Sequence, residues 1–442
     1  MVVTMMSVLR VTSLLAPIMA AFLVSGVAGT MDLIILPNKS SVDLGAVCLD
    51  GTAPAMYFHA ANSTTEPAAE TKWVIYFKGG GWCYEEDDCV RRSRTSDGST
   101  SGLSQTGGFR FGPLDQDPAA NPTFAHANHV ELWYCDGGSF TGDRTEPLVV
   151  NGTTLYFRGK RILDALLAFL KLNHGLSKAT EVLLSGGSAG GLSAFLHADY
   201  VRSHFGPEVK FGVAPVSGFF LMHDNVQGIN AYPARMQYVY NMMNSSGGVN
   251  QRCRAAQAPG DAWRCIFANY SYAHTQVPVF PLQSSVDKWQ MGAIFAMEKA
   301  GNPDCTRSTA LIDGSERQLA KCTELQRHAV AQYQRDFLFD LKASEAFARP
   351  GNGGYIESCI EHVAGQTRAY NTYRSPASGL TMQQALTAWW DSGFKEPAAK
   401  HWQLPCMLHT GGDFGQCNPS CTANLTRPLD QVVPSEELNV AI

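Results

Sequence analysis

The sequence has no cluster of basic residues. Its 34 lysines and arginines are outnumbered by 39 aspartates and glutamates, which gives a formal net charge of -5 at pH 7. Domains that bind nucleic acid or anionic lipid usually carry runs or patches of lysine and arginine. The composition therefore argues against a nucleic-acid partner and against electrostatic attachment to a membrane surface.

Long hydrophobic runs are missing from the body of the chain, where no segment offers the roughly 20 apolar residues of a membrane-spanning helix. The N-terminus is different, because a mostly apolar run from Val11 to Val27 follows Arg10 and ends in small residues. This is the pattern of a secretory signal, and we expect a signal peptide over residues 1–28, cleaved near Ala28. The run is also long enough for an uncleaved membrane anchor, which is the alternative interpretation.

The spacing of a zinc site is missing as well. No Cys-x-x-Cys pair with attendant histidines occurs, so we expect no metal. The cysteines are even in number and mostly in closely spaced couples, which is typical of disulfides formed in an oxidising compartment. All of them lie beyond the expected signal, at Cys48, Cys83, Cys89, Cys135, Cys253, Cys265, Cys305, Cys322, Cys359, Cys406, Cys417 and Cys421.

Sites for N-linked glycans agree with export. An Asn-x-Ser/Thr sequon accepts a glycan only in the secretory pathway, and one alone is weak support. This chain has six, at Asn38, Asn62, Asn151, Asn244, Asn269 and Asn424. Together with the N-terminus and the cysteines they predict a secreted glycoprotein of the extracellular space or cell wall.

No internal repeat, coiled-coil heptad or Pro/Ser-rich linker divides the chain, so we expect residues 29–442 to form a single domain. Short apolar runs, several closed by glycine, predict buried strands at Trp73–Phe77, Val130–Tyr134, Glu181–Ser185, Phe211–Pro215 and Val277–Leu282. Helical periodicity predicts helices at Arg161–Leu172, Leu192–Val201, Leu319–Leu341 and Met382–Trp390. This alternation predicts an α/β fold with a mostly parallel central sheet and helices on both faces.

Two stretches are longer than simple crossovers between strands, namely Met222–Ala273 and Lys288–Arg349. Each contains a couple of cysteines. We therefore expect disulfide-stapled insertions that roof a site.

The strongest motif is Gly186-Gly187-Ser188-Ala189-Gly190, which follows a predicted strand and precedes a predicted helix. This is the G-x-S-x-G elbow of α/β-hydrolases, in which a strained turn exposes the hydroxyl of a nucleophilic serine. Ser188 is the predicted nucleophile. The N–H of Ala189 lies at the start of the helix, where it can donate to an oxyanion. A glycine-rich turn that merely packs a helix onto the sheet is the alternative.

A second glycine cluster, Gly79-Gly80-Gly81, ends an earlier strand. Hydrolases of this fold place such a loop where its N–H groups complete the oxyanion hole. A phosphate-binding loop fits less well, because Trp82 and Cys83 interrupt the G-x-G-x-x-G pattern and no Gly-Lys-Ser/Thr follows. Neither glycine turn therefore indicates a nucleotide-binding site, and we expect no cofactor.

A serine nucleophile needs a histidine base and a carboxylate, which in this fold follow in the order Ser, Asp/Glu, His. The order leaves His362, which follows a short late apolar stretch, with His401 and His409 as open alternatives. His328 lies in a charged helical pattern, and His274 immediately precedes the strand that should carry the acid.

The favoured acid is Asp287, the first carboxylate after the strand Val277–Leu282, and Asp224 is its nearest rival. The competing interpretation of Asp287 is a helix N-cap, which is a common use of aspartate.

Six motifs, in order and over nearly the whole chain from Cys48 to Cys421, resemble the pectin acetylesterases and their animal relatives, the Notum carboxylesterases. They are GGGWC at Gly79–Cys83, YCDGGSFTGD at Tyr134–Asp143, FRG at Phe157–Gly159, GSAGG at Gly187–Gly191, VDKWQ at Val286–Gln290 and SCIEH at Ser358–His362. The resemblance implies an α/β-hydrolase fold with a catalytic triad at the positions of Ser188, Asp287 and His362. It also implies an oxyanion hole made by the backbone of Gly80, Gly81 and Ala189.

This chain departs from the plant branch of the family at Gly187 and Val363, where the plant proteins resemble one another in having cysteine. Its tail, Cys417–Cys421, is more similar to the Notum branch. The departures imply a different local pairing of cysteines. We expect Cys83 to pair with Cys89 and stiffen the glycine loop, with Cys48–Cys135 and Cys406–Cys417 as further candidate pairs.

The sequence thus predicts a monomeric carboxylesterase that works through an acyl-enzyme at Ser188. Its expected substrate is an acetylated polysaccharide such as pectin, because the body of the chain resembles the plant branch. A Notum-like deacylase acting on a fatty-acyl ester of a protein is the alternative. A catalytically silent binding protein on the same fold is the second alternative, since a fold does not dictate a function.

Overall fold

The structure is a computed structural model that describes residues 30–37, 45–108, 111–302, 305, 322–395 and 418–422. The expected signal peptide, residues 1–28, lies outside these described ranges. Among the described helices, none combines the length and apolar character needed to cross a bilayer.

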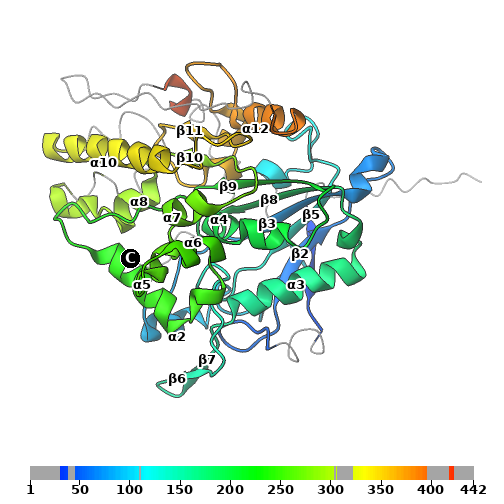
Figure 1. The fold of residues 1–442 in the computed structure, drawn as a ribbon, viewed down its shortest axis with the longest axis horizontal. Coiled ribbons are helices and arrows are strands. Elements are labelled where there is room, and N and C mark those ends of the chain that lie inside the picture. The colour runs from blue at the N-terminus through cyan, green and yellow to red at the C-terminus, as the bar shows by residue number, and fades with distance from the viewer. Residues whose placement is uncertain are drawn as a thin grey trace, which may run out of the picture.

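A nine-stranded sheet forms the centre of the molecule, in the order β11-β10-β9-β8-β3-β5-β2-β1-β4 (Figure 1). The run from β11 to β5 is parallel, and β5, β2, β1 and β4 pair antiparallel. The strands are β1 (Met31–Ile35), β2 (Ala55–His59), β3 (Lys72–Phe77), β4 (Thr106–Gly107), β5 (Asn128–Leu132), β8 (Glu181–Gly187), β9 (Lys210–Val216), β10 (Leu282–Ser284) and β11 (Tyr355–Glu357).

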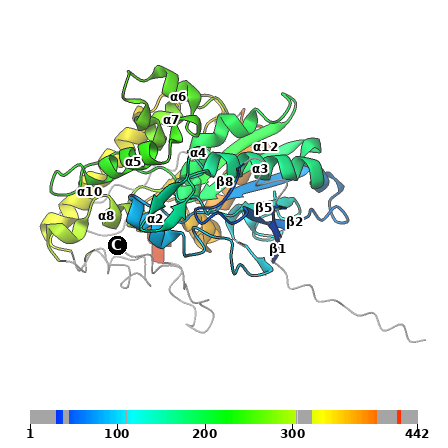
Figure 2. The same ribbon diagram turned by 90° about the horizontal axis from the view of Figure 1, so that it is seen from below.

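Long helices cover both faces of the sheet. On one face α3 (Gly159–Asn173) and α4 (Ala189–Arg202) lie side by side (Figures 1 and 2), joined where the Tyr200 hydroxyl donates to Asp164. The Arg202 guanidinium of α4 lies over the ring of Phe211 in β9. The next residue, Gly212, faces Trp389 of α12 (Met382–Asp391), and neighbouring residues of a strand point to opposite faces. The predicted mostly parallel α/β sheet is therefore confirmed.

The last predicted strand differs from the structure. The sequence predicts Val277–Leu282, whereas β10 covers only Leu282–Ser284, with one isolated bridge from Val279 to Val213. Pro278 and Pro281 explain the difference, because proline has no N–H to donate to a strand ladder. Most of the apolar run is buried as expected, and it keeps some strand-like bonds, such as the one from the Phe280 N–H to the Val213 carbonyl, without forming a continuous ladder.

The two predicted insertions form small helical groups beyond one end of the sheet (Figures 1 and 2). The first contains α5 (Ala231–Met242), α6 (Gln251–Ala256) and α7 (Ala268–His274), and the second contains α8 (Lys288–Ala293) and α10 (Glu324–Ala343). Thr323 begins α10 with a capping box that it shares with Gln326. The disulfides Cys253–Cys265 and Cys305–Cys322 staple the two groups, as expected.

Three more disulfides hold the central part of the molecule. The predicted pairs Cys48–Cys135 and Cys83–Cys89 are both confirmed. Cys359 pairs with Cys421, which ties the segment after β11 to the short 3-10 helix Pro419–Thr422. Cys406 and Cys417, the third candidate pair, lie outside the described residues.

A buried aspartate organises the turn that follows β5. Asp136 Oδ2 accepts hydrogen bonds from the N–H groups of Gly138 and Phe140, at 3.1 and 2.9 Å. The carboxylate also faces the first residue of α3, since a Cβ at Gly159 would lie 2.2 Å from Asp136 Oδ2. Burial raises the pKa of Asp136 to about 7, even though these backbone N–H groups favour its charged form.

The glycines of the elbow provide the first prediction. A Cβ at Gly190 would lie 2.1 Å from the carbonyl oxygen of Phe77, and backbone on both sides leaves no room to move. We expect Gly190→Ala to lower the free energy of unfolding in urea by about 3 kcal/mol or more. Gly292→Ala in α8 is the matched control, because nothing lies within 4 Å of its Cβ, and it should gain up to about 1 kcal/mol. Equal effects of the two substitutions would contradict the packing described here.

A pH dependence follows from Asp136. Its pKa is higher in the folded protein, about 7 against an ordinary 3.8, so the folded state binds the proton more tightly than the unfolded state. The stability that it contributes is therefore complete below about pH 4 and is lost as the pH rises towards 7. In Asp136→Asn this loss should disappear. Between pH 4.5 and pH 7.5 the free energy of unfolding in urea should fall by about 3 kcal/mol more in the wild type than in the variant, and identical pH profiles would disprove the assignment.

Candidate active site

Ser188 lies at the end of the central strand β8, directly before α4. Its backbone is strained, with φ 57° and ψ -126°, as a sharp strand-to-helix turn requires. A Cβ at Gly186 would lie 2.3 Å from the carbonyl oxygen of Gly190, which explains why the motif needs glycine on both sides of the serine. The predicted elbow is present.

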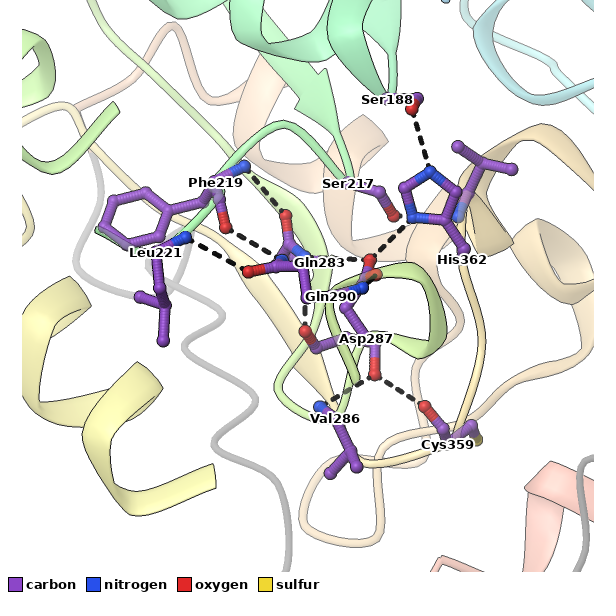
Figure 3. Close-up of polar contacts among 12 residues, drawn as sticks. Ser188, Ser217, Phe219, Leu221, Gln283, Val286, Asp287, Gln290, Cys359 and His362 are labelled. Atoms are coloured by element: carbon purple, nitrogen blue, oxygen red, sulfur yellow. Dashed lines mark hydrogen bonds and ion pairs between the residues drawn. The ribbon is translucent and has the colours of Figure 1, made fainter. Parts of the chain in front are cut away.

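The three residues predicted as a triad lie in one line of hydrogen bonds (Figure 3). His362 Nε2 lies 2.9 Å from Ser188 Oγ, and His362 Nδ1 lies 2.8 Å from Asp287 Oδ2. Asp287 is completely buried, whereas the His362 side chain is 16% exposed. The contact with the carboxylate places the imidazole proton on Nδ1, so Nε2 can accept the proton of the serine hydroxyl.

Asp287 is a helix N-cap and also contacts His362. Its Oδ1 accepts the N–H of Gln290 at 3.1 Å and caps α8, while its Oδ2 faces His362. The cap fixes the carboxylate group, so that its second oxygen is aimed at the imidazole.

Left-handed backbone fixes the position of His362. The next residue, Val363, has φ 57°, which is unusual for a β-branched side chain. Its N–H donates to Ser217 Oγ at 2.8 Å, and Ser217 follows β9 with φ 47° (Figure 3). The side chain of Gln366 occupies the space that a side chain at position 187 would need, because a Cβ at Gly187 would lie 2.1 Å from Gln366 Nε2. A glutamine amide thus occupies the space beside Gly187, on the loop that carries the base.

Two buried glutamines surround Asp287 and were not singled out in the sequence. Gln290 Oε1 accepts the N–H of Leu221, and its Nε2 donates to the Phe219 carbonyl (Figure 3). The same Oε1 also accepts the hydroxyl of Tyr333. Gln283 Oε1 accepts the N–H of Phe219, and its Nε2 reaches Asp287 Oδ2 at 3.4 Å. They join the acid to the segment after β9. Only the position of Gln290 in the motif Val286–Gln290 could have pointed to one of them.

The glycine loop after β3 lies against the elbow. A Cβ at Gly79 would come 2.4 Å from the Gly187 carbonyl and 3.0 Å from the Ser188 Cβ. Among the described residues, the N–H groups of Gly80, Gly81 and Ala189 have no hydrogen-bond partner. The structure therefore packs the glycine loop, with its unpaired donors, against the elbow that carries Ser188 and Ala189.

The carbonyl groups of the glycine loop, by contrast, are all engaged. The Arg92 guanidinium donates to the Gly80 carbonyl, and the Tyr134 hydroxyl donates to the Gly81 carbonyl at 2.6 Å. Asp97 pairs with Arg92 and with Lys78. With its oxygens held, the loop presents its N–H groups in a fixed direction.

Two further carboxyl groups lie near Asp287. Burial raises the pKa of Glu357 well above its ordinary value, and burial likewise raises the pKa of Glu361. Glu357 also lies close to Cys359 and Cys421, and carboxylate and cysteine side chains bind metal ions in other proteins. Here the two sulfurs are bonded to each other, so they offer no thiolate.

Aromatic rings line the approach to His362. Trp289 stacks on the imidazole with ring centroids 6.2 Å apart, and Phe220 lies at 6.2 Å. Trp82 contacts both, at 5.7 Å from Trp289 and 4.9 Å from Phe220. Tyr232 of α5 closes the group, and its buried hydroxyl has no hydrogen-bond partner among the described residues.

The rival site residues lie elsewhere. Asp224 is exposed and accepts a hydrogen bond from Asn230. His328 faces Glu324 on the surface of α10, as the charged helical pattern predicts, and His274 ends α7. His401 and His409 lie outside the described residues.

Known proteins resemble this chain over most of its length. The family model for pectinacetylesterase matches residues 27–408. Pectin acetylesterase 4 of Arabidopsis thaliana is 33% identical over 360 residues, which cover 81% of this chain and 84% of the relative. The palmitoleoyl-protein carboxylesterase Notum of Homo sapiens is 27% identical over 417 residues, covering 90% of this chain and 75% of the relative.

The fold agrees with a solved structure. The crystal structure of the Wnt deacylase Notum from Drosophila superimposes with a TM-score of 0.69 at 23% identity, covering 89% of this chain and 99% of that one. The family thus indicates ester hydrolysis, and the solved structure supports the fold. The chain belongs to the pectinacetylesterase family and is a carboxylic ester hydrolase with the α/β-hydrolase fold.

Proposed function

We propose that this chain is a secreted serine esterase that removes O-acetyl groups from pectin or a related cell-wall polysaccharide. The observation that carries the proposal is the line of hydrogen bonds from Asp287 through His362 to Ser188, beside a glycine loop with unpaired N–H groups. The disulfides support export, because they form in oxidising compartments. All the groups that act come from one chain, so a monomer suffices.

In the first half of the reaction Ser188 Oγ attacks the acetyl carbonyl carbon while His362 Nε2 takes the hydroxyl proton. The negative charge that develops on the carbonyl oxygen is stabilised by the N–H groups of Gly80, Gly81 and Ala189. The imidazolium is stabilised by Asp287 Oδ2. When the bond to the sugar oxygen breaks, His362 returns the proton to that oxygen, and the deacetylated sugar leaves.

Water completes the reaction. His362 removes a proton from a water molecule, whose oxygen attacks the acetyl-enzyme through a second tetrahedral intermediate at the same N–H groups. Breakdown of this intermediate releases acetate and restores the Ser188 hydroxyl with the proton from His362. No cofactor and no metal enters either step.

The aromatic rings support a short acyl chain. Trp82, Phe220 and Trp289 contact one another beside His362, so their side chains fill much of the apolar space that a long acyl chain would need. The same rings also provide an apolar surface, which would contact a fatty acyl chain once the rings moved apart. This property favours the second candidate, a Notum-like deacylase of proteins. The human relative named palmitoleoyl-protein carboxylesterase keeps this candidate in view.

The triad assignment predicts large and non-additive losses of activity. Ser188→Ala should abolish hydrolysis of p-nitrophenyl acetate, while Asp287→Asn and His362→Ala should each lower kcat by about a thousandfold or more. Adding either change to Ser188→Ala should cost little more, because the three residues act as a unit. The former rivals serve as controls, and Asp224→Asn and His328→Ala should keep wild-type rates.

Residual turnover above a few per cent in Ser188→Ala, or additive losses, would refute the assignment. Labelling of Ser188 by a fluorophosphonate probe tests the binding-protein alternative. A folded wild-type protein that neither reacts with the probe nor hydrolyses the ester would be such a binding protein.

Acyl-chain length separates the two candidate substrates. We expect kcat/KM to fall from acetyl to butyryl to octanoyl esters. A pocket that accepts the chain would instead raise kcat/KM about fourfold per methylene, at about 0.8 kcal/mol each, and a steep rise would favour the deacylase. Tyr232→Ala should open space behind Trp82 and Trp289 and shift the preference towards octanoyl. Tyr238→Ala, an exposed tyrosine of the same helix, is the control and should leave the preference unchanged.

A further inference from the structure

A single buried serine contacts both segments that carry the proposed oxyanion donors. Ser139 lies in the turn after β5 and is fully buried. Its Oγ accepts the indole N–H of Trp82 at 2.8 Å and donates to the Ala189 carbonyl at 2.9 Å. Trp82 directly follows Gly81 of the glycine loop, and Ala189 directly follows Ser188 of the elbow. One hydroxyl group thus joins two loops that are more than a hundred residues apart in the chain.

The backbone of Ser139 also bonds towards both segments, through its N–H group and through its carbonyl group. Its N–H donates to the Tyr134 hydroxyl at 3.0 Å, and that hydroxyl donates in turn to the Gly81 carbonyl. On the other side, His197 Nε2 of α4 lies 3.3 Å from the Ser139 carbonyl. Burial lowers the pKa of His197 to about 3, so its ring is neutral and uses Nε2 as the donor. Ser139 is therefore held to the glycine loop and to the helix that begins at the elbow.

The backbone conformation of Ser139 is strained, and hydrogen bonds to the Asp136 carboxylate stabilise it. Ser139 and Phe140 both have left-handed backbone, with φ of 55° and 57°. Two consecutive non-glycine residues in this region are costly and persist only where the surroundings hold them. Here the Asp136 carboxylate holds them through the N–H groups of Gly138 and Phe140.

We propose that Ser139 is a positioning residue that fixes the two halves of the oxyanion hole relative to each other. The proposal rests on the proposed function, since it assigns the N–H groups of Gly80, Gly81 and Ala189 to the oxyanion. Such donors are effective when they are fixed before the charge develops. Ser139 supplies this by accepting from one loop and donating to the other, which a hydroxyl can do and an alkyl side chain cannot.

The consequences of removing the hydroxyl are unequal on the two sides. The Ala189 carbonyl would keep a second partner, because Ser193 Oγ also donates to it at 3.0 Å. The indole N–H of Trp82 would lose its hydrogen bond and remain buried, which is unfavourable. The glycine loop is therefore the half that loosens. Ser193→Ala is the matched control, because it removes a bond to the same carbonyl without touching the glycine loop.

The test compares Ser139→Ala, Ser193→Ala and the wild type on p-nitrophenyl acetate and on a methyl trifluoromethyl ketone. The ketone adds to the serine and leaves an oxyanion in the hole. In Ser139→Ala we expect kcat to fall about 10- to 100-fold, KM to change less than threefold, and the affinity for the ketone to fall in parallel with kcat. Ser193→Ala should stay within about threefold of wild type throughout. A KM effect without a kcat effect, or equal behaviour of the two variants, would overturn the proposal.

A double-mutant cycle separates positioning from general destabilisation. Trp82→Phe removes the indole N–H, so Ser139→Ala should cost much less in that background than in the wild type, and additive losses would contradict the proposal. If Ser139→Ala does not fold, Trp82→Phe alone should show the parallel loss of kcat and ketone affinity, and unchanged values would overturn the proposal. Stoichiometric fluorophosphonate labelling of Ser188 in the wild type is required first. Its absence refutes the proposed function, whereas labelling with an unaffected Ser139→Ala refutes only the role of Ser139.

Discussion

The close approach of two backbone segments is the constraint on which the site depends. β3 and β8 are neighbours, and the loop after one lies against the turn after the other. A Cβ at Gly79 would come within 2.4 Å of the Gly187 carbonyl, and one at Gly190 within 2.1 Å of the Phe77 carbonyl. Glycine at these positions lets N–H groups from two distant parts of the chain reach the side of Ser188. The same approach brings Trp82 and Ala189 within reach of one hydroxyl, that of Ser139.

Two buried glutamines hold Asp287, the acid of the proposed triad. Asp287 is fully buried, and a lone carboxylate in that position would be costly. Gln290 and Gln283 donate to it from backbone and side chain, and each also bonds the segment that begins at Phe219. Because every polar group of Gln290 is paired, the network is rigid and its geometry is well defined. Phe220, held in this segment, therefore keeps a fixed position relative to the imidazole of His362.

The elbow, the fold class and the disulfide Cys83–Cys89 could be predicted because their signals are local, whereas Cys48 and Cys135 are 87 residues apart. Ser188 stands in a short motif between a strand and a helix, and Cys83 is only a few residues from Cys89. Motif resemblance, not spacing, singled out His362. The roles of Ser139, Gln283 and Gln290 depend on contacts across 50 to 71 residues of chain, which no local pattern encodes. The shortened β10 was predictable in principle, since Pro278 and Pro281 cannot donate to a ladder.

The proposed triad and the aromatic rings beside it come from different parts of this chain. Ser188, Asp287 and His362 all follow parallel strands of the central sheet, where packing on both faces leaves little freedom. All four rings of this group stand outside the strands: Trp82 follows the glycine loop, Phe220 lies on the segment after β9, Tyr232 on α5 and Trp289 on α8. A change at Tyr232 on α5 can therefore alter this group of rings without touching a residue that bonds Asp287, whereas a change in α8 also affects Gln290, whose N–H donates to Asp287. The relatives of this chain include proteins named pectin acetylesterase and palmitoleoyl-protein carboxylesterase, and we expect the acyl preference under the proposed function to depend on this group of rings rather than on the sheet.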